Sequence, residues 1–332
     1  AEATVEVDME AVVLVQQAQK MIPFLLRLPV PVPIALNQLQ SSYTPVDATH
    51  LEDNGLAITG RGLHPRSGPS APISETFEEY IQQLPDWEFK ILVAISFDVP
   101  PYTAISHLIA GNASITFVSD GSQVDDRMSF GWVAATTTGT RLFSCQGPAW
   151  GRATSHRAEA IGMLSVTRFL HHLCLFCQYH ESLNIQCFCD NEGLLSRINN
   201  RISYASNLYP NVTLEPDWDI VEEIWATVAA SPHKFTFTHV KGHQDKEVDY
   251  DELELEAQLN VDADYQAGDF IHAQLQGLPN SFRLPSTKCH FCIDKVAITA
   301  YVRSRVRDAA LRGPLLRKLS ESKHWSDLTY RD

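Results

Sequence analysis

The order of apolar segments between Ile115 and Phe270 constrains this chain more than any other feature. Three segments have the alternating or β-branched composition of strands, and helical and strand-like segments then follow in turn. In order, they are strands at 115–119, 129–135 and 141–147, a helix at 157–173, a strand at 184–189, a helix at 218–229, a strand at 235–239 and a helix at 253–270. This order predicts a mixed α/β sheet covered by helices.

Two carboxylates stand where strands of this sheet are predicted to end. Asp120 follows the strand 115–119 and opens a turn signal, Asp120-Gly-Ser122. Asp190 directly follows the strand 184–189 in the same way. Strands that lie side by side and both end in Asp can bring the two side chains close together. We therefore expect Asp120 and Asp190 to share one edge of the sheet.

Two further acids lie on helix faces that are otherwise small and apolar. Glu159 is stacked over Gly162, Met163 and Val166, the residues three, four and seven positions later. Asp264 has similar neighbours on the last helix. An unpaired carboxylate on such a face would cost several kcal/mol or take up a proton.

Four acids in such positions need a common counter-charge. Mg²⁺ or Mn²⁺, which bind oxygen ligands, would supply it. Where two such ions are bound, one activates water and the other stabilises the leaving oxygen of an in-line phosphoryl displacement. Any one of these acids alone is better interpreted as a strand-end cap or an exposed helix charge. The set of Asp120, Glu159, Asp190 and Asp264 predicts a two-metal site.

The stretches around these acids resemble the type 1 ribonuclease H family in order and spacing, over about residues 111–272. They are Phe117-Val-Ser-Asp-Gly-Ser122, Phe130-Gly-Trp-Val133, Ser155-His-Arg-Ala-Glu159, Cys189-Asp190-Asn191, His239-Val-Lys-Gly-His-Gln-Asp245 and Leu259-Asn-Val-Asp-Ala-Asp-Tyr-Gln-Ala267. The form of the histidine motif and the flanking regions look most like the ribonuclease H domain of a retrotransposon reverse transcriptase polyprotein. The resemblance implies a mixed five-stranded sheet flanked by helices, with helical N- and C-terminal extensions.

The resemblance also implies roles for individual residues. Asp120, Glu159, Asp190 and Asp264 match the family's metal-binding carboxylates. Asp262 is a rival for the last place, but the acid that follows Ala and precedes Tyr-Gln-Ala is Asp264. His243 matches a histidine on a mobile loop that shuttles protons or assists product release. Four residues match contacts to the minor groove of the hybrid and to its 2′-hydroxyls: Ser122, Ser155, His156 and Asn191.

The implied activity is hydrolysis of the RNA strand of an RNA–DNA hybrid with two Mg²⁺ ions, for which Mn²⁺ substitutes. The chain order of the acids separates this activity from that of integrases, whose Glu comes last, and from that of proofreading exonucleases, whose first strand carries Asp-x-Glu. Two alternatives from other classes stay open. One is an inactive nucleic-acid-binding relic of a mobile element, and the other is a scaffold segment of its polyprotein.

Charge is distributed unevenly along the chain. The formal net charge is −14, which argues against a general nucleic-acid binder. The segment from Arg283 to the end nevertheless carries 11 Lys and Arg against 5 Asp and Glu. Between Asp245 and Glu256, by contrast, seven acids stand against Lys246 alone, so this segment must point away from a hybrid or limit its affinity. We expect the C-terminal segment to bind phosphates or to present a solvated helical face.

The 332 residues allow roughly one to three domains. We expect an N-terminal extension at 1–110 with a linker at 52–73, a ribonuclease H domain at 111–272 and a basic, helical extension at 273–332. The first of these would be the distal end of a reverse transcriptase or a connection to it.

No apolar run is long enough to cross a bilayer, because prolines and Arg27 interrupt the best candidate, 21–36. We expect a fragment or processed piece rather than a secreted precursor. The seven scattered cysteines predict reduced thiols in an intracellular protein. Cys289 and Cys292 have the spacing of half a zinc site, but no second pair stands at a suitable distance.

Overall fold

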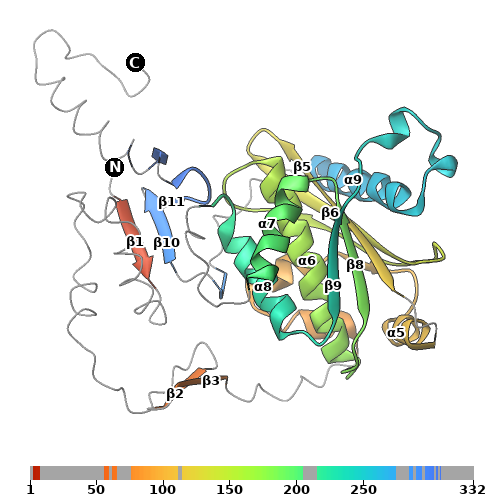
Figure 1. The fold of residues 1–332 in the computed structure, drawn as a ribbon, viewed down its shortest axis with the longest axis horizontal. Helices are drawn as coiled ribbons and strands as arrows, with labels where there is room; N and C mark the ends of the chain where they lie inside the picture. The colour runs from red at the N-terminus through yellow and green to blue at the C-terminus, as the bar shows by residue number, and fades with distance from the viewer. Residues whose placement is uncertain are drawn as a thin grey trace, which may run out of the picture.

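A computed structural model describes most of the chain between residues 76 and 273 and short stretches outside it (Figure 1). None of the helices among these residues has the length and apolar character needed to cross a membrane. The described residues are 3–7, 56–59, 62–65, 76–110, 114–204, 215–273, 284–286, 289–293, 296–302, 304, 305 and 307.

The central element is a mixed sheet of six strands, in the order β4-β7-β6-β5-β8-β9. Pairing is antiparallel from β4 to β5 and parallel from β5 through β8 to β9. The strands are β4 (Ile95–Phe97), β5 (Ile115–Val124), β6 (Arg127–Thr136), β7 (Arg141–Pro148), β8 (Asn184–Cys189) and β9 (Lys234–His239). The mixed α/β fold predicted from the sequence is therefore confirmed.

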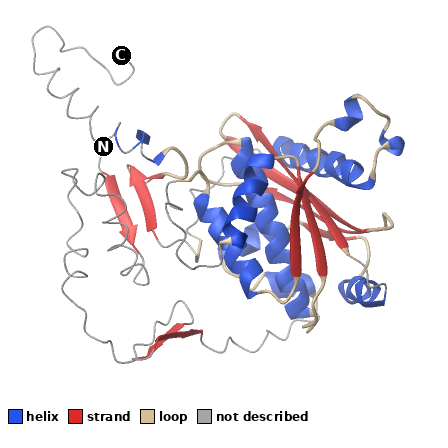
Figure 2. Cartoon of the chain, viewed as in Figure 1, coloured by secondary structure: helices blue, strands red, loops and turns tan. Residues whose placement is uncertain are grey.

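Helices cover both faces of this sheet (Figure 2). Helix α6 (Ser155–Phe176) packs on β5 and β6, with α7 (Glu192–Ser203) and α8 (Trp218–Ala230) beside it. The opposite face is covered by α9 (Leu255–Ala273). The alternation of β5 supplies both interfaces, since Phe117 belongs to the larger core under α6 and Val118 to a smaller one that includes Leu259. Two short 3₁₀ helices, η3 (Gln244–Lys246) and η4 (Tyr250–Glu252), connect β9 to α9.

Strand β5 is longer than the sequence predicted. Asp120-Gly-Ser122 was expected to form a turn, but all three residues are paired with β6, and the chain turns at Asp125-Asp126. Asp125 has the left-handed backbone (φ 55°) that Asp tolerates better than most residues. Gly121 lies within the strand, paired with Phe130 of β6. A Cβ at this position would collide with the backbone nitrogen of Glu159 in α6. The glycine is required for close packing and not for a turn.

The sheet has six strands rather than the predicted five, because a strand from the expected N-terminal extension joins it. β4 pairs with β7. It follows α3 (Phe77–Ile81) and α4 (Asp86–Leu92) and precedes α5 (Pro101–Ala110). Thr76 caps α3 by accepting a hydrogen bond from the Glu79 amide, as the capping-box pattern predicts. Residues 76–97 therefore share the sheet and core of the segment 111–272, and the three-part domain division stays a prediction.

The flanking segments differ from their expected structures in the parts that are described. Within the predicted linker 52–73, β2 (Leu56–Thr59) and β3 (Gly62–Pro65) form an antiparallel pair. The predicted helical C-terminal extension contains β10 (Cys289–Ile293) and β11 (Val296–Ala297) before helical backbone begins at Val302. β10 pairs with β1 (Ala3–Val7), and such a long-range partner cannot be read from local sequence. The apolar run 21–36 lies outside the described residues.

A buried polar cluster fastens α3 and α4 to α6. Arg168 of α6 forms an ion pair with Glu88, whose carboxylate also lies 3.2 Å from Nε2 of His172. The other ring nitrogen of His172 is 2.9 Å from the hydroxyl of Tyr80. Burial lowers the pKa of Arg168 and holds the pKa of His172 well below its usual value, so Glu88 faces one charged and one neutral partner.

Replacing Glu88 tests whether residues 76–97 are part of this fold. Glu88→Gln should lower the free energy of unfolding by about 3 kcal/mol, because it removes the ion-pair partner of the mostly buried Arg168 guanidinium. The matched change Glu247→Gln breaks an exposed pair with Lys241 and should cost less than about 1 kcal/mol. Urea titrations followed by circular dichroism measure both values. Equal losses would contradict the integration of α4 into the core.

Candidate active site

Asp120 and Asp190 lie at one edge of the sheet on neighbouring parallel strands. Val118 of β5 is paired with Phe188 of β8, and each acid stands two positions further along its strand direction. Asp120 is 6% exposed, whereas Asp190 is partly exposed. The first carboxylate accepts a 2.6 Å hydrogen bond from the amide of Gly121. The expected meeting of these two acids follows from the parallel register.

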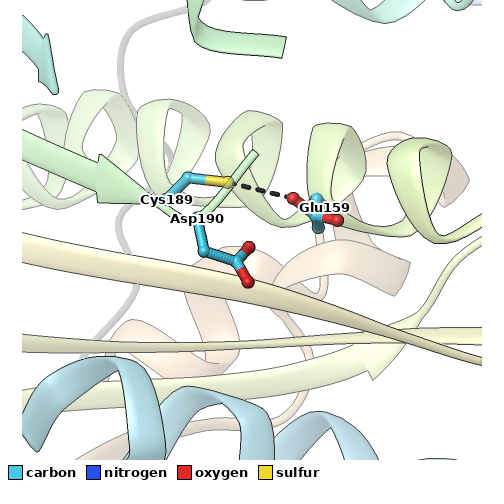
Figure 3. Close-up of side chains that lie close together, drawn as sticks. All are labelled: Glu159, Cys189 and Asp190. Atoms are coloured by element: carbon cyan, nitrogen blue, oxygen red, sulfur yellow. Dashed lines mark hydrogen bonds between the residues drawn. The ribbon is translucent and has the colours of Figure 1, made fainter. Parts of the chain in front are cut away.

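Glu159 reaches the same edge from the first turns of α6. Two glycines allow this approach, since a Cβ at Gly121 would collide with the Glu159 backbone and one at Gly162 would collide with the hydroxyl of Ser119. Glu159 accepts hydrogen bonds from the Cys189 thiol at 3.1 Å and from the side-chain Nδ2 of Asn191 at 3.3 Å. Figure 3 shows the thiol directed at Glu159 with the Asp190 carboxylate beside them.

The last helix presents its two candidate acids to different partners. Asp262 lies 2.7 Å from Arg141 and accepts a 2.8 Å hydrogen bond from the Tyr250 hydroxyl. Asp264 lies 3.7 Å from Nδ1 of His243. Its charge also acts on Asp120, whereas Asp262 already has a cationic partner. This arrangement favours Asp264 as the fourth acid of the cluster.

Crowding and burial raise the pKa values of Asp120 and Glu159, the two buried acids of the candidate site. Burial raises the pKa of Asp120 to about 8, and the charges of Asp190, Glu159 and Asp264 add to this effect. Burial and the Asp190 charge raise the pKa of Glu159 to about 7, although the hydrogen bonds from Cys189 and Asn191 oppose the increase. Among the described residues, no Lys or Arg forms an ion pair with Asp120, Glu159 or Asp190.

These side chains fit a divalent cation in their chemistry. Ligand atoms of Glu159, Cys189 and Asp190 lie within 4.8 Å of one another. Gly242, which follows the end of β9, packs against Asp190, where a Cβ would collide with the carboxylate. Burial and the Glu159 charge hold the pKa of the Cys189 thiol well above its usual value, so the anionic ligands are oxygens. Oxygen ligands of this kind suit Mg²⁺ and Mn²⁺.

The four predicted substrate contacts take different positions around this cluster. Ser155 is exposed as the first residue of α6, and Ser122 is partly exposed on β5. Asn191 bonds to Glu159 and also caps α7 by accepting from the Leu194 amide. His156 lies between Asp217 at 3.2 Å and Arg197 at 3.1 Å. Asn191 and His156 therefore make structural contacts, and their binding to a hybrid stays a prediction.

Two supporting groups were not predicted from the sequence. Cys189 was counted only among the reduced thiols, and its contact with Glu159 was not foreseen. Arg157, two residues before Glu159 on α6, is fully buried and pairs with Asp217 and Asp219 at 2.8 Å each. An arginine inside the Ser155–Glu159 motif was the available signal, because a buried guanidinium requires acidic partners.

Comparison with known proteins gives structural matches and no sequence relative. No family model matches the chain, and no match was found among curated proteins. Ribonuclease H1 of the archaeon Halobacterium salinarum matches 48% of this chain and 99% of its own, at 15% identity and a TM-score of 0.34. LC11-RNase H1, solved with an RNA/DNA hybrid, matches 49% and 99%, at 16% identity and a TM-score of 0.35. The protease–reverse transcriptase of prototype foamy virus matches 49% and 21%, at 19% identity and a TM-score of 0.38. Likenesses this distant do not decide the family, so the chemistry must be inferred from the side chains.

The pKa of Asp120 predicts how the metal-free protein responds to pH. An acid whose pKa is raised on folding stabilises the fold below its unfolded value and loses that contribution as the pH rises through its folded value. The parent protein in EDTA should therefore lose stability between about pH 4 and pH 8. Asp120→Asn should be more stable at pH 8 by at least about 1.4 kcal/mol, the free energy of one pKa unit. This difference should shrink toward pH 4.

Asp262→Asn is the control for this measurement, because it removes an acid that has a cationic partner. It should lower stability at pH 8 by up to about 1 kcal/mol. Melting temperatures at both pH values give the sign of each effect. A less stable Asp120→Asn protein at pH 8 would show that the acids are not crowded.

Proposed function

We propose that this chain is an endoribonuclease that hydrolyses the RNA strand of RNA–DNA hybrids with divalent metal ions. The observation that carries the proposal is the cluster of Asp120, Glu159 and Asp190, which are buried or partly buried. Among the described residues, none of the three has a basic partner. The charge of Asp264 also contributes to the raised pKa of Asp120. A cluster of acids of this kind fits metal-assisted phosphoryl transfer. The resemblance of its motifs to type 1 ribonuclease H narrows the substrate to the hybrid, with 3′-hydroxyl and 5′-phosphate products.

The four carboxylates would hold two Mg²⁺ ions, or Mn²⁺ in their place. When bound, such ions supply an activated water and stabilise the charge on the leaving oxygen. The protein's own contribution is to fix the ligands. The hydrogen bonds from Cys189 and Asn191 hold both oxygens of Glu159, and the Gly121 amide orients Asp120. Ser122, Ser155, His156 and Asn191 would contact the minor groove of the hybrid, as the resemblance implies.

His243 would move protons to or from the reacting groups. It is exposed, has a left-handed backbone (φ 52°), and lies 3.7 Å from Asp264. Histidine is the side chain whose proton exchange falls nearest neutral pH. An exposed histidine beside one acid of the cluster can exchange protons with solvent between turnovers.

The wider setting of this activity rests on the resemblance alone. We infer an intracellular protein from a retroelement polyprotein, in which a reverse transcriptase precedes the ribonuclease H domain and supplies the hybrid. Residues 1–110 would be the distal end of that reverse transcriptase or a connection to it. The alternative of an inactive relic predicts that the protein binds a hybrid without cleaving it.

The central test is cleavage of a hybrid labelled on its RNA strand, with Mg²⁺ and with EDTA. The parent protein should cleave only with Mg²⁺. Asp120→Asn and Asp190→Asn should each abolish cleavage while the protein stays folded, because each keeps the shape of the side chain and removes a metal-binding charge. Asp262→Asn is the matched control on α9 and should retain cleavage. Unchanged turnover by Asp120→Asn or Asp190→Asn would refute the site, and binding without any cleavage by the parent would favour the relic.

Replacement of His243 separates proton transfer from metal binding. His243→Ala should slow cleavage by about ten- to a hundredfold, within the usual contribution of acid–base catalysis. The Mg²⁺ concentration that gives half-maximal rate should not change, because this proposal gives the histidine no role as a ligand. A large rise in that concentration would instead identify His243 as a metal ligand.

A further inference from the structure

The described part of the C-terminal segment packs against the end of the domain at which α6 and α8 begin. Leu284 is 1% exposed within the main core, and the Ser286 amide donates a 2.8 Å hydrogen bond to Glu223 of α8. Further along, the carbonyl of Thr299 accepts a 2.7 Å hydrogen bond from the amide of Asp217. Val302 is again 1% exposed. The segment is therefore attached to the domain on both sides of β10 and β11.

Asp217 connects this segment to the first turn of α6. One carboxylate oxygen accepts from Arg157, the other lies 3.2 Å from His156, and the amide is bonded to Thr299. Glu159 follows His156 by three residues, or roughly 5 Å of helix. The C-terminal segment is thus held beside the end of α6 that carries Glu159.

Two arginines gather at this position. The guanidinium of Arg152 lies over the ring of Tyr301, 5.5 Å from its centre, and Tyr301 is 66% exposed. The carbonyl of Tyr301 accepts from the amide of Arg305 at 3.0 Å, so Arg305 stands one helical turn further on, and it is exposed. Arg152 precedes Ser155 by three residues. Arg152 therefore lies near the start of α6, and the Arg305 backbone lies one turn from the tyrosine that Arg152 contacts.

This location matters because the proposed substrate is a polyanion and most of the chain is acidic. Residues 245–256 carry seven acids after His243, and the four acids of the candidate site add to the negative field. Phosphates next to that site need cations, and guanidinium groups bind phosphate well. Arg152 and Arg305 supply two at the end of α6, from segments 153 residues apart in the chain.

We propose that Arg152 and Arg305, with Tyr301 positioning Arg152, form a surface that binds the phosphate backbone of the nucleic-acid substrate beside Ser155 and His156. This proposal rests on the proposed ribonuclease function and specifies where its substrate would be held. Its contacts are to phosphates, so it adds affinity and carries no sequence preference.

Binding titrations of the full chain test this surface without requiring catalysis. A fluorescent hybrid is titrated in EDTA at several salt concentrations. Arg152→Gln and Arg305→Gln should each weaken binding by about three- to tenfold and reduce the slope of log K against log salt by about 0.7 to 0.9, the value of one phosphate contact. Tyr301→Ala should weaken binding less than Arg152→Gln does, and Tyr301→Phe should restore the parent value because it keeps the ring beneath Arg152.

Two matched changes control for loss of net charge. Lys234→Gln removes an exposed cation at the start of β9, the end opposite His239 and the acid cluster. Arg307→Gln removes an exposed cation two residues beyond Arg305, a spacing that does not share a helix face. Both should leave the salt slope near that of the parent. Slopes of Arg152→Gln and Arg305→Gln that match these controls would overturn the proposal.

The binding titrations and the cleavage assay distinguish failure of this surface from failure of the ribonuclease proposal. If the parent cleaves the hybrid but neither arginine changes binding, this surface is refuted and the active site stands. If no cleavage occurs but Arg152→Gln and Arg305→Gln still reduce the salt slope, the surface stands and the protein binds nucleic acid without cutting it.

Discussion

Helix α6 lies so close to strand β5 that residues 121 and 162 must both be glycine, and the candidate site depends on this approach. A Cβ at either position would meet backbone or side-chain atoms of the opposite element. The approach brings Glu159 from a helix to the edge where Asp120 and Asp190 leave neighbouring strands. Without it, the two strands would still align their aspartates, but Glu159 would be displaced and the cluster would lose one of its two buried carboxylates. Packing of two elements thus sets the spacing of the ligands.

The protein treats its buried charges in two ways. Away from the candidate site, the buried and partly buried arginines of the described helices α6 and α7 have acidic partners: Arg157 with Asp217 and Asp219, Arg168 with Glu88, and Arg201 with Glu222. At the site, Asp120 and Glu159 are buried among acids, and both pKa values are raised. Among the described residues, no Lys or Arg pairs with this group, so its burial costs folding free energy, as is common at functional sites. The missing cation is the physical reason to infer a metal.

Local patterns allowed much of the fold and most of the candidate site to be predicted. The bounds of the strand Asn184–Cys189 were predicted correctly, because a run of residues that favour strands is followed directly by Asp190. The choice between Asp262 and Asp264 needed the resemblance, and the structure separates them by giving Asp262 a partner from β7. The predictions that were wrong or missing concerned elements whose structure depends on partners far away in the chain. Ile95–Phe97 is too short to be recognised as a strand until it pairs with β7, and the continuation of β5 through Gly121 depends on α6. The roles of Cys189 and Asp217 likewise come from contacts between elements far apart in the chain.

The connection between β9 and α9 has two parts with different neighbours: residues 242–243 contact the acid cluster, and the acidic residues 245–256 follow. Its first part places Gly242 against Asp190 and His243 beside Asp264. Its acidic part is tied elsewhere, because the Tyr250 hydroxyl donates to Asp262 and accepts from Arg141, and Gln258 donates to the Tyr250 carbonyl. Residues two apart on a helix do not share a face, so the Asp262 anchor and Asp264 lie on different sides of α9. On α9, Asp264 thus belongs to the proposed site, whereas Asp262 anchors Tyr250 of the acidic connection.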